Sequence, residues 1–237
     1  MGDRATEIRK LAPDLFMIRT DFPQVYLWWD GSEVTMIDAG FPGDEPALAE
    51  LGLPTTALQR LVLTHHHEDH TGAAADVANW GDVEVVAHRA DAPVIRGERP
   101  PPRRTLTHEE RAIFERVSAG IPPAPPCRVD SEVESGDIVA IGGGATVISG
   151  DGHTAGSIGL LVREPRVLFT GDLIVTTPGG PTLGHFNDDA ASARRSAAAM
   201  AAHDVLLLCP GHGEPLTDPQ VLSELEAALA SSAPGVL

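Results

Sequence analysis

The sequence predicts an α/β (α+β) fold built from two similar halves, each of which runs from short β-strands into α-helices. Two observations favour this fold. Short apolar runs alternate with turn signals over the first forty residues, and the same alternation returns between residues 138 and 170. Each half also contains an apolar strand that leads into a loop of histidine or aspartate. Together these features indicate two sheets packed face to face, with helices outside.

The first half begins with an antiparallel meander and continues as strand, loop, helix and strand, which is the order of an α/β unit. The continuous apolar run that precedes the histidines is typical of a buried strand. In chain order, the expected elements are strands Leu15–Arg19, Val25–Trp29 and Val34–Ile37, a helix around Pro46–Leu51, strand Arg60–Thr64, a helix over Gly72–Trp80 and strand Val83–Ala87.

Between Ala90 and Asp130 the pattern changes to proline-rich segments around a short helical stretch, which we interpret as an inserted lid or linker. A second meander, a helix and a further strand follow it. The expected elements are a helix over His108–Ser118, strands Ile138–Ile141, Ala145–Ser149, Ser157–Val162 and Arg166–Thr170, a helix capped near Asn187 or Asp188 and ending near Ala202, strand Val205–Cys209 and a last helix from Thr217.

Length and composition are those of a globular protein. The chain has 237 residues, 42% of them hydrophobic, which is enough to bury a core. The first ten residues are charged, and no later segment is apolar over the length that a bilayer crossing needs. Cys127 and Cys209 are too few for a disulfide framework, so we expect reduced thiols, a cytoplasmic location and no membrane partner.

The charge balance disfavours nucleic acid as a partner. The net charge is −17, and such a chain repels a polyanion because affinity for nucleic acid comes largely from basic residues. Lys10 is the only lysine, which indicates a compositional preference for arginine across the chain. We therefore expect the arginines between residues 96 and 104 to be solvated rather than to bind an anionic substrate.

Four side chains that bind metals fall within the six positions His65–His70. His65 and His67 stand two residues apart at a strand end, so both rings can point to the same side and reach one ion. Asp69 and His70 follow where the chain turns, and this offset suits a second ion. A surface or tag-like histidine run is the alternative, and the preceding strand and the aspartate within the run argue against it.

Three further candidate ligands, His153, Asp172 and His212, each follow an apolar run and are flanked by glycine. Glycine beside a ligand lets the backbone turn sharply and lets an ion approach closely. Together with the histidine run, these residues make seven nitrogen and oxygen ligands without a cysteine. Such a set suits two divalent metal ions.

The chain resembles the metallo-β-lactamase superfamily through His-x-His-x-Asp-His at residues 65–70, Gly-His-Thr at His153, Thr-Gly-Asp at Asp172 and Gly-His-Gly at His212. The motifs occur in the family's order and span most of the chain. The resemblance implies a four-layer αββα sandwich formed by a single metallo-β-lactamase-fold domain over residues 1–237, with a lid-like insertion at about 90–130. It also implies two zinc ions per chain, with manganese or iron as alternatives.

The resemblance gives each ligand a role. It assigns His65, His67 and His153 to the first ion, Asp69, His70 and His212 to the second, and Asp172 to both. Two ions that share a water lower its pKa and leave a bridging hydroxide as the nucleophile. Asp69 is also expected to act catalytically by assisting proton transfer, although metal binding weakens it as a base. Asp38 is expected either to support a ligand histidine or to act only as a turn carboxylate.

The resemblance to individual branches favours a glyoxalase II-like hydrolase. Asp172 argues against a true β-lactamase, which lacks this bridging carboxylate. No lysine or arginine follows His212, which makes glutathione recognition doubtful. Val175 stands where the homoserine lactonases carry a tyrosine. The prediction is a dinuclear metal-dependent hydrolase that cleaves an ester-like bond, such as a thioester, a lactone or another ester.

Two alternatives stay open. One is a lactonase or phosphodiesterase of the same fold, and the other is a non-hydrolytic iron-dependent oxygenase or redox protein. The expected partner is a small-molecule substrate, with a homodimer as an open alternative. We expect substrate contacts to come from the lid-like insertion and from His185, which follows Asp172 in the chain.

Overall fold

The computed structural model describes residues 7–20, 23–43, 55–103, 106–119, 121–217 and Leu225. The helix expected around Pro46–Leu51 lies outside the described residues, as does nearly all of the last helix expected from Thr217. The chain divides into two compact units. Unit 1 consists of Met1–Pro101 and Ile121–Val133, and unit 2 consists of Pro102–Gly120 and Glu134–Leu237.

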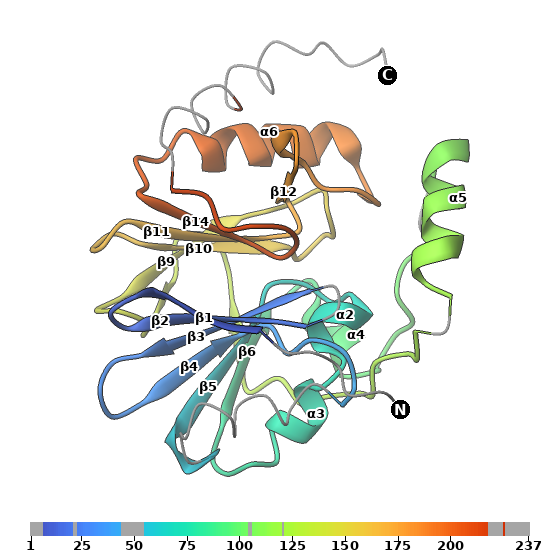
Figure 1. Cartoon of the computed structure of the whole chain (residues 1–237). Coiled ribbons are helices and arrows are strands. Elements are labelled where there is room, and N and C mark those ends of the chain that lie inside the picture. Colours follow the sequence, from blue (N-terminus) through green and yellow to red (C-terminus); the bar gives the residue numbers. More distant parts are fainter. Residues whose placement is uncertain are drawn as a thin grey trace. The chain divides into compact units, whose positions relative to one another are not determined.

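Unit 1 is a seven-stranded sheet with short helices (Figure 1). The strands follow the chain in the order β1-β2-β3-β4-β5-β6-β7, antiparallel as far as β4 and parallel from β4 to β7. Its elements are β1 (Glu7–Ala12), β2 (Leu15–Arg19), β3 (Gln24–Trp29), β4 (Val34–Ile37), η1 (Thr55–Ala57), β5 (Leu58–Leu63), α2 (Glu68–Thr71), α3 (Ala74–Val77), β6 (Glu84–His88), α4 (Ala92–Ile95) and β7 (Ser131–Val133).

Strand β5 lies inside this sheet and carries the histidine run at its carboxyl end. Leu61, Val62 and Leu63 are fully buried. β5 pairs in parallel with β4 and β6, and a parallel strand with both faces buried typically has such a continuous apolar run. The core of unit 1 therefore holds the start of the run firmly in place.

Unit 2 contains a five-stranded sheet of order β14-β11-β10-β9-β8 and a separate hairpin of β12 and β13. Its elements are α5 (His108–Val117), β8 (Ile138–Val139), β9 (Ala145–Ser149), β10 (Ile158–Val162), β11 (Val167–Gly171), β12 (Ile174–Thr177), β13 (Gly180–Leu183), α6 (Ala190–Ala201) and β14 (Leu207–Pro210).

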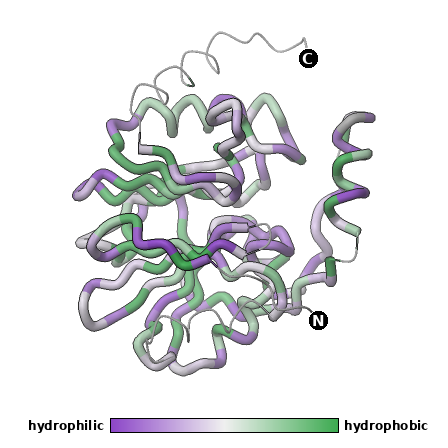
Figure 2. The backbone as a smooth tube through the Cα atoms, in the orientation of Figure 1, coloured by the Kyte–Doolittle hydropathy of each residue, from purple (hydrophilic) through white to green (hydrophobic). Residues whose placement is uncertain are grey.

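Helix α6 covers one face of this sheet (Figure 1). Its small residues Ala193 and Ala197 and its Met200 are fully buried among leucines of β10, β11 and β14. These strands are mostly hydrophobic in Figure 2, whereas α5 alternates between hydrophobic and hydrophilic residues. Burial of this apolar face is the main force that fixes α6 on the sheet.

The predicted meanders are confirmed, and strands β2, β4 and β9 have the expected bounds. The helix predicted over Gly72–Trp80 is wrong in its bounds, because α2 already begins at Glu68 and α3 ends at Val77. Strands β1, β7, β12 and β13 were not predicted. They are short or partly exposed, so their sequences lack a long apolar pattern.

The segment from Ala90 to Asp130, predicted as a lid-like insertion, is divided between the two units. Its first and last parts belong to unit 1, where α4 is partly buried and the backbone N–H of Cys127 donates to Ile95 at 2.9 Å. Its middle part, α5, belongs to unit 2, where Phe114 packs edge-on against Phe186 with ring centroids 5.4 Å apart. Within the described residues, no helix is long and apolar enough to cross a membrane.

Candidate metal centre

In unit 1, the rings of His65 and His67 each direct one nitrogen toward the other ring. The Nε2 atom of His65 lies 2.9 Å from the Nδ1 atom of His67, and both side chains are buried. The loop follows the end of β5 directly, so the two side chains, spaced by two, share one side of the chain. The expectation that both rings face one point is confirmed.

The Nδ1 atoms of His65 and His70 are each held by a neighbouring side chain. His65 Nδ1 lies 3.0 Å from the hydroxyl of Thr64, and His70 Nδ1 lies 2.8 Å from the carboxylate of Asp38. Asp38 also accepts hydrogen bonds from the backbone and hydroxyl of Thr64. Such contacts fix a ring so that its remaining nitrogen can bind a metal. Of the two roles expected for Asp38, this contact favours support of a histidine ring, that of His70, over a turn carboxylate alone.

The remainder of the run turns into helix α2. Asp69 Oδ2 lies 3.7 Å from His70 Nε2, so these two predicted ligands face one another in unit 1. His66 points its side chain elsewhere, and its backbone N–H donates to the buried carboxylate of Asp91 at 3.0 Å. Asp91 is a supporting residue that no local sequence pattern indicates, since it is separated from the run by strand β6.

In unit 2, Asp172 stands between two histidines. Its Oδ2 atom lies 3.1 Å from His212 Nε2 and 3.8 Å from His153 Nε2. Strands β9 and β11 both pair antiparallel with β10, and β14 pairs in parallel with β11, so β9, β11 and β14 run in one direction. The three predicted ligands follow the carboxyl ends of these strands, which meet at one edge of the sheet.

Two glycines allow this close approach. Gly152, beside His153, has φ +111°, and an added Cβ would lie 2.0 Å from the backbone nitrogen of Ala193. Gly213, beside His212, has φ +90°, and an added Cβ would lie 2.0 Å from the carbonyl oxygen of Thr176. Both positions combine a left-handed backbone with no room for a side chain. The prediction that flanking glycines permit sharp turns is confirmed at these two positions.

The donor sets of both units fit divalent metal ions. Each unit offers imidazole nitrogens and at least one carboxylate, largely buried and directed toward one another, and no cysteine lies among them. Buried groups of this kind are usually paired or bound to a metal, because burial of an unpaired charge is costly. Imidazole and carboxylate together suit zinc, manganese or iron.

Neither cysteine belongs to these groups of side chains. Cys127 and Cys209 are buried and form no disulfide, as the sequence predicts. Burial raises the pKa of the Cys127 thiol to about 11, while the Arg128 guanidinium opposes this shift and the Asp130 carboxylate adds to it. A thiol that stays protonated at neutral pH is a poor nucleophile and metal ligand.

His185, the predicted substrate contact, is exposed in the loop between β13 and α6. Its ring lies beside Phe186, which contacts α5. Among the arginines of the predicted lid, Arg96 pairs with Glu98 and Glu132 at the surface, as expected for a solvated segment. Arg104 lies outside the described residues.

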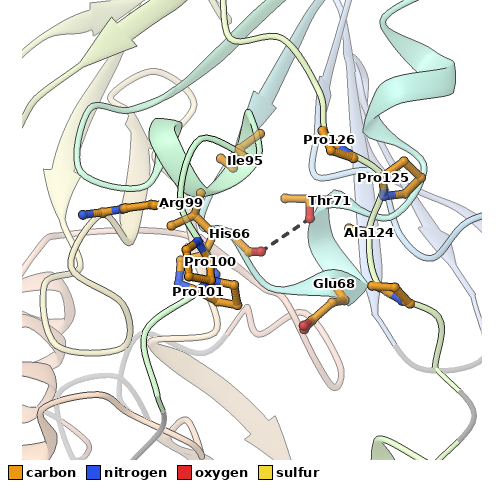
Figure 3. Close-up of a pocket in the computed structure, with 13 residues that line it drawn as sticks. His66, Glu68, Thr71, Ile95, Arg99, Pro100, Pro101, Ala124, Pro125 and Pro126 are labelled. Atoms are coloured by element: carbon orange, nitrogen blue, oxygen red, sulfur yellow. Dashed lines mark hydrogen bonds between the residues drawn. The ribbon is translucent and has the colours of Figure 1, made fainter.

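A pocket of about 260 Å³ opens in unit 1 beside the histidine run (Figure 3). Its lining consists of His66, Glu68, Thr71, Val94, Ile95, Gly97, Arg99, Pro100, Pro101, Pro123, Ala124, Pro125 and Pro126. Figure 3 shows Pro100 on one side and Pro126 on the other, with Thr71 between them. Two parts of the predicted lid thus line this pocket. His66 and Glu68 line it as well, and in the sequence they alternate with the predicted metal ligands of the histidine run.

A family model described as the metallo-beta-lactamase superfamily matches residues 18–212, which include all seven predicted ligands. The chain belongs to this superfamily. The match begins within β2 of unit 1 and ends just after β14 of unit 2, so it includes the whole five-stranded sheet of unit 2. It confirms the resemblance inferred from the four motifs and, at the level of the family, the prediction of a metal-dependent hydrolase.

Relatives of known name are similar at low identity. The "Probable metallo-hydrolase YflN" of Bacillus subtilis (strain 168) is 27% identical over 214 residues, which are 80% of this chain and 79% of that protein. A "Hydroxyacylglutathione hydrolase" of Rhodobacter capsulatus is 27% identical over 64% of this chain and 47% of its own length. The "Acyl-coenzyme A thioesterase MBLAC2" of Gallus gallus is 32% identical over 48% of this chain and 40% of its own length.

Solved structures confirm the fold. A metallo-beta-lactamase family protein from Thermus thermophilus superposes with a TM-score of 0.69 at 22% identity, covering 94% of this chain and 81% of that protein. The subclass B3 metallo-beta-lactamase of Bradyrhizobium japonicum gives a TM-score of 0.71 at 22% identity, covering 94% and 90%. The predicted metallo-β-lactamase fold is therefore confirmed.

Proposed function

We propose that this chain is a dinuclear metal-dependent hydrolase that cleaves an ester-like bond in a small molecule. The observation that carries the proposal is the position of Asp172, whose carboxylate reaches both His153 and His212. A carboxylate with two histidines at this spacing is suited to contact two ions at once. The convergence of His65 and His67 in unit 1 provides a second, independent set of donors.

The seven predicted ligands divide between two ions in this proposal. His65, His67 and His153 take the first, Asp69, His70 and His212 take the second, and Asp172 takes both. We propose zinc, with manganese and iron as alternatives, because the donors are nitrogen and oxygen only. When bound, such a pair lowers the pKa of a shared water and polarises the bond under attack.

In this proposal, residues of the protein orient the metal-binding side chains and transfer a proton to or from the substrate. Asp38 and Thr64 hold the rings of His70 and His65, so these side chains lose little freedom on binding. Asp69, the proposed catalytic acid or base, is the more exposed partner of the Asp69–His70 pair, with 17% of its side chain accessible. Its carboxylate is therefore open to a leaving group that needs a proton.

We propose that the predicted lid determines the substrate specificity. Its two flanking segments form the walls of the pocket beside His66 and Glu68, and its helix α5 contacts the loop that carries His185. Thioesters are the first class to test, since two of the relatives are named for thioester substrates.

The experiment combines metal analysis with a substrate panel. Purified protein is expected to carry two zinc ions per chain and to hydrolyse at least one of a thioester, a lactone or another ester. Asp172→Ala is expected to lower this activity on the order of a thousandfold, since loss of metal-ion catalysis removes several kcal/mol of transition-state stabilisation.

Asp204→Ala serves as the matched control. Asp204 is also an aspartate of unit 2, but it pairs with Arg166 at the surface, and its loss is expected to leave activity unchanged. Full activity in Asp172→Ala would contradict the bridging role. One iron per chain together with oxygen consumption would support the redox alternative, and activity on phosphodiesters alone would support the phosphodiesterase alternative.

Location and assembly belong to the same proposal. We propose a cytoplasmic enzyme that acts on a small molecule without nucleic acid or membrane. The buried free thiols of Cys127 and Cys209 suit a reducing compartment. The net charge of −17 supports the exclusion of nucleic acid. Light scattering of the purified protein will distinguish a monomer from the homodimer alternative.

A further inference from the structure

The loop between β13 and α6 is fastened to the loop of His153. The backbone N–H of Asp188 donates to the carbonyl of His153 at 3.1 Å, and the backbone N–H of Asp189 donates to the carbonyl of Gly152 at 2.9 Å. These two bonds set Asn187 beside the imidazole of His153. Asn187 Oδ1 lies 3.1 Å from His153 Nδ1.

A second contact fixes which end of the Asn187 amide faces the ring. Asn187 Nδ2 donates to the carbonyl oxygen of Gly184 at 2.6 Å. A carbonyl oxygen only accepts, so the amide nitrogen must point to Gly184 and the amide oxygen to His153. The alternative orientation would place two acceptors against one another at Gly184. The hydrogen-bond network therefore determines the amide orientation.

An amide oxygen only accepts, so its partner on His153 must donate. This requirement places the proton of the neutral imidazole on Nδ1 and leaves the lone pair on Nε2. Nε2 is also the nitrogen that faces the carboxylate of Asp172, at 3.8 Å. The tautomer selected by Asn187 is thus the one that offers a ligand atom on the side of Asp172.

We propose that Asn187 is a positioning residue that locks His153 in the Nδ1-protonated tautomer and so prepares Nε2 for a metal ion. The inference rests on the metal role proposed for His153. Asn187 in unit 2 corresponds to Asp38 in unit 1. The Asp38 carboxylate faces His70 Nδ1 and, like the Asn187 amide oxygen, can only accept a hydrogen bond from the ring. Partners of this kind typically contribute about 10–100-fold to metal affinity.

The first test reads the tautomer without any metal. Metal-stripped protein labelled with ¹⁵N is studied by NMR at about pH 8, where a histidine of ordinary pKa is neutral. The ring nitrogens of His153 are assigned by their loss in His153→Gln. We expect a protonated Nδ1 in the wild type and in Asn187→Asp, which keeps the accepting oxygen. Asn187→Leu, of similar size, is expected to shift the ring toward the Nε2-protonated tautomer.

The second test measures zinc affinity by competition with a chromophoric chelator. Asn187→Leu is expected to weaken the binding of zinc about 10–100-fold. Asn187→Asp is expected to restore part of it, because the Nδ1 proton again has an acceptor although the hydrogen bond to Gly184 is lost. Asn79→Leu is the matched control: Asn79 is the only other asparagine, is exposed and donates to the backbone of Ala75. That variant is expected to bind zinc as the wild type does.

The outcomes separate the inference from the proposed function. An unchanged His153 tautomer together with unchanged zinc affinity in Asn187→Leu would overturn the positioning role. A wild-type protein that binds neither zinc, manganese nor iron would overturn the proposed metal function, while the tautomer measurement would still report on Asn187. If Asn187→Leu does not fold, loss of the Nδ1 proton in Asn187→Asp overturns the inference and its retention supports it.

Discussion

The two units position their candidate ligands by different physical means. In unit 1 the ligands are nearly consecutive, and buried side chains orient them: Asp38 holds His70, and Thr64 holds His65. In unit 2 the ligands lie on three separate loops, and close backbone approach at Gly152 and Gly213 brings them together. The first group depends on side-chain hydrogen bonds, whereas the second combines the Asn187 contact to His153 with close backbone approach that a side chain at Gly152 or Gly213 would block.

This difference follows from how far apart the ligands lie in the sequence. Residues at the end of one strand share a side because of the strand's period, so only the ring orientation remains to be fixed. Ligands on separate loops need the loops themselves to converge, which demands tight turns and contacts between backbones. The comparison predicts that substitution of Gly152 harms the candidate site of unit 2 through steric overlap, and that substitution of Asp38 harms that of unit 1 through a lost hydrogen bond.

The largest effect is expected from Gly152→Ala. The new methyl group would collide with the backbone of Ala193, and the residue would keep a φ of +111°. Left-handed strain and overpacking together are expected to lower the free energy of unfolding by about 3 kcal/mol. Urea denaturation measures this loss, and zinc titration of the folded protein is expected to show weaker binding, since His153 is displaced.

Gly180→Ala is the matched control for that substitution. Gly180 has nearly the same φ, +108°, but no atom lies within 4 Å of its added Cβ. Its cost is expected to be only the backbone strain, roughly 1–2 kcal/mol. Equal losses in the two variants would show that strain alone matters and would remove the distinction between the two units.

An intermediate effect is expected from Asp38→Asn. The amide oxygen can still accept from the backbone N–H of Thr64, but the amide nitrogen then faces His70 Nδ1 in place of a carboxylate oxygen. A donor at this place favours the wrong tautomer of His70. Zinc affinity is expected to fall about 10–100-fold, as measured by chelator competition.

Asp130→Asn controls for the loss of a structural carboxylate in unit 1. Asp130 also accepts from a strand backbone, the N–H of Val85, and its carboxylate pairs with Arg128. Its substitution is expected to leave zinc affinity unchanged. A similar loss of affinity in both variants would mean that Asp38 acts through general stability rather than through His70.

The smallest effect is expected at Asp189, which begins α6 in unit 2. Hydrogen bonds from the backbone N–H and the side chain of Ser192 lower the pKa of this carboxyl below its ordinary value of 3.8. Because the folded-state pKa is depressed, Asp189 stabilises the protein above about pH 4 and loses this effect as the pH falls through the depressed pKa.

Urea denaturation of the wild type and Asp189→Ala between about pH 7 and pH 3 tests this dependence. The stability difference between the two proteins is expected to be constant from about pH 7 to pH 5 and to shrink below about pH 4. A difference that stayed constant down to the lowest pH would mean that the charge of Asp189 contributes nothing to the start of the helix.

Several elements could be predicted because a local pattern specifies them. Strand β5 is an apolar run long enough to be recognised, and the histidines that follow it carry their own chemistry. The strand bounds of β2, β4 and β9 follow from alternation and turns within a few residues. Asp38 was also accessible to this reasoning, since a carboxylate at a strand end is a recurrent partner of buried histidines.

Other features could not be predicted because they depend on distant partners. Helix α2 begins within the histidine run at Glu68, a start without a side-chain cap that no local signal marks. Asp91 supports the backbone of His66 across 25 positions, and Asn187 faces His153 across 34. The pocket likewise joins residues near 66, 100 and 125, which only folding brings together.

The sequence by itself determined the family and the chemistry of the donors, because motif spacing and side-chain type are local properties of the chain. It placed His65 and His67 on one side through the period of a strand. Only the tertiary structure decided how Asp172 meets His153 and His212, and which nitrogen of each ring is left to bind. Those choices depend on backbone turns and buried hydrogen bonds between segments that are distant in the sequence.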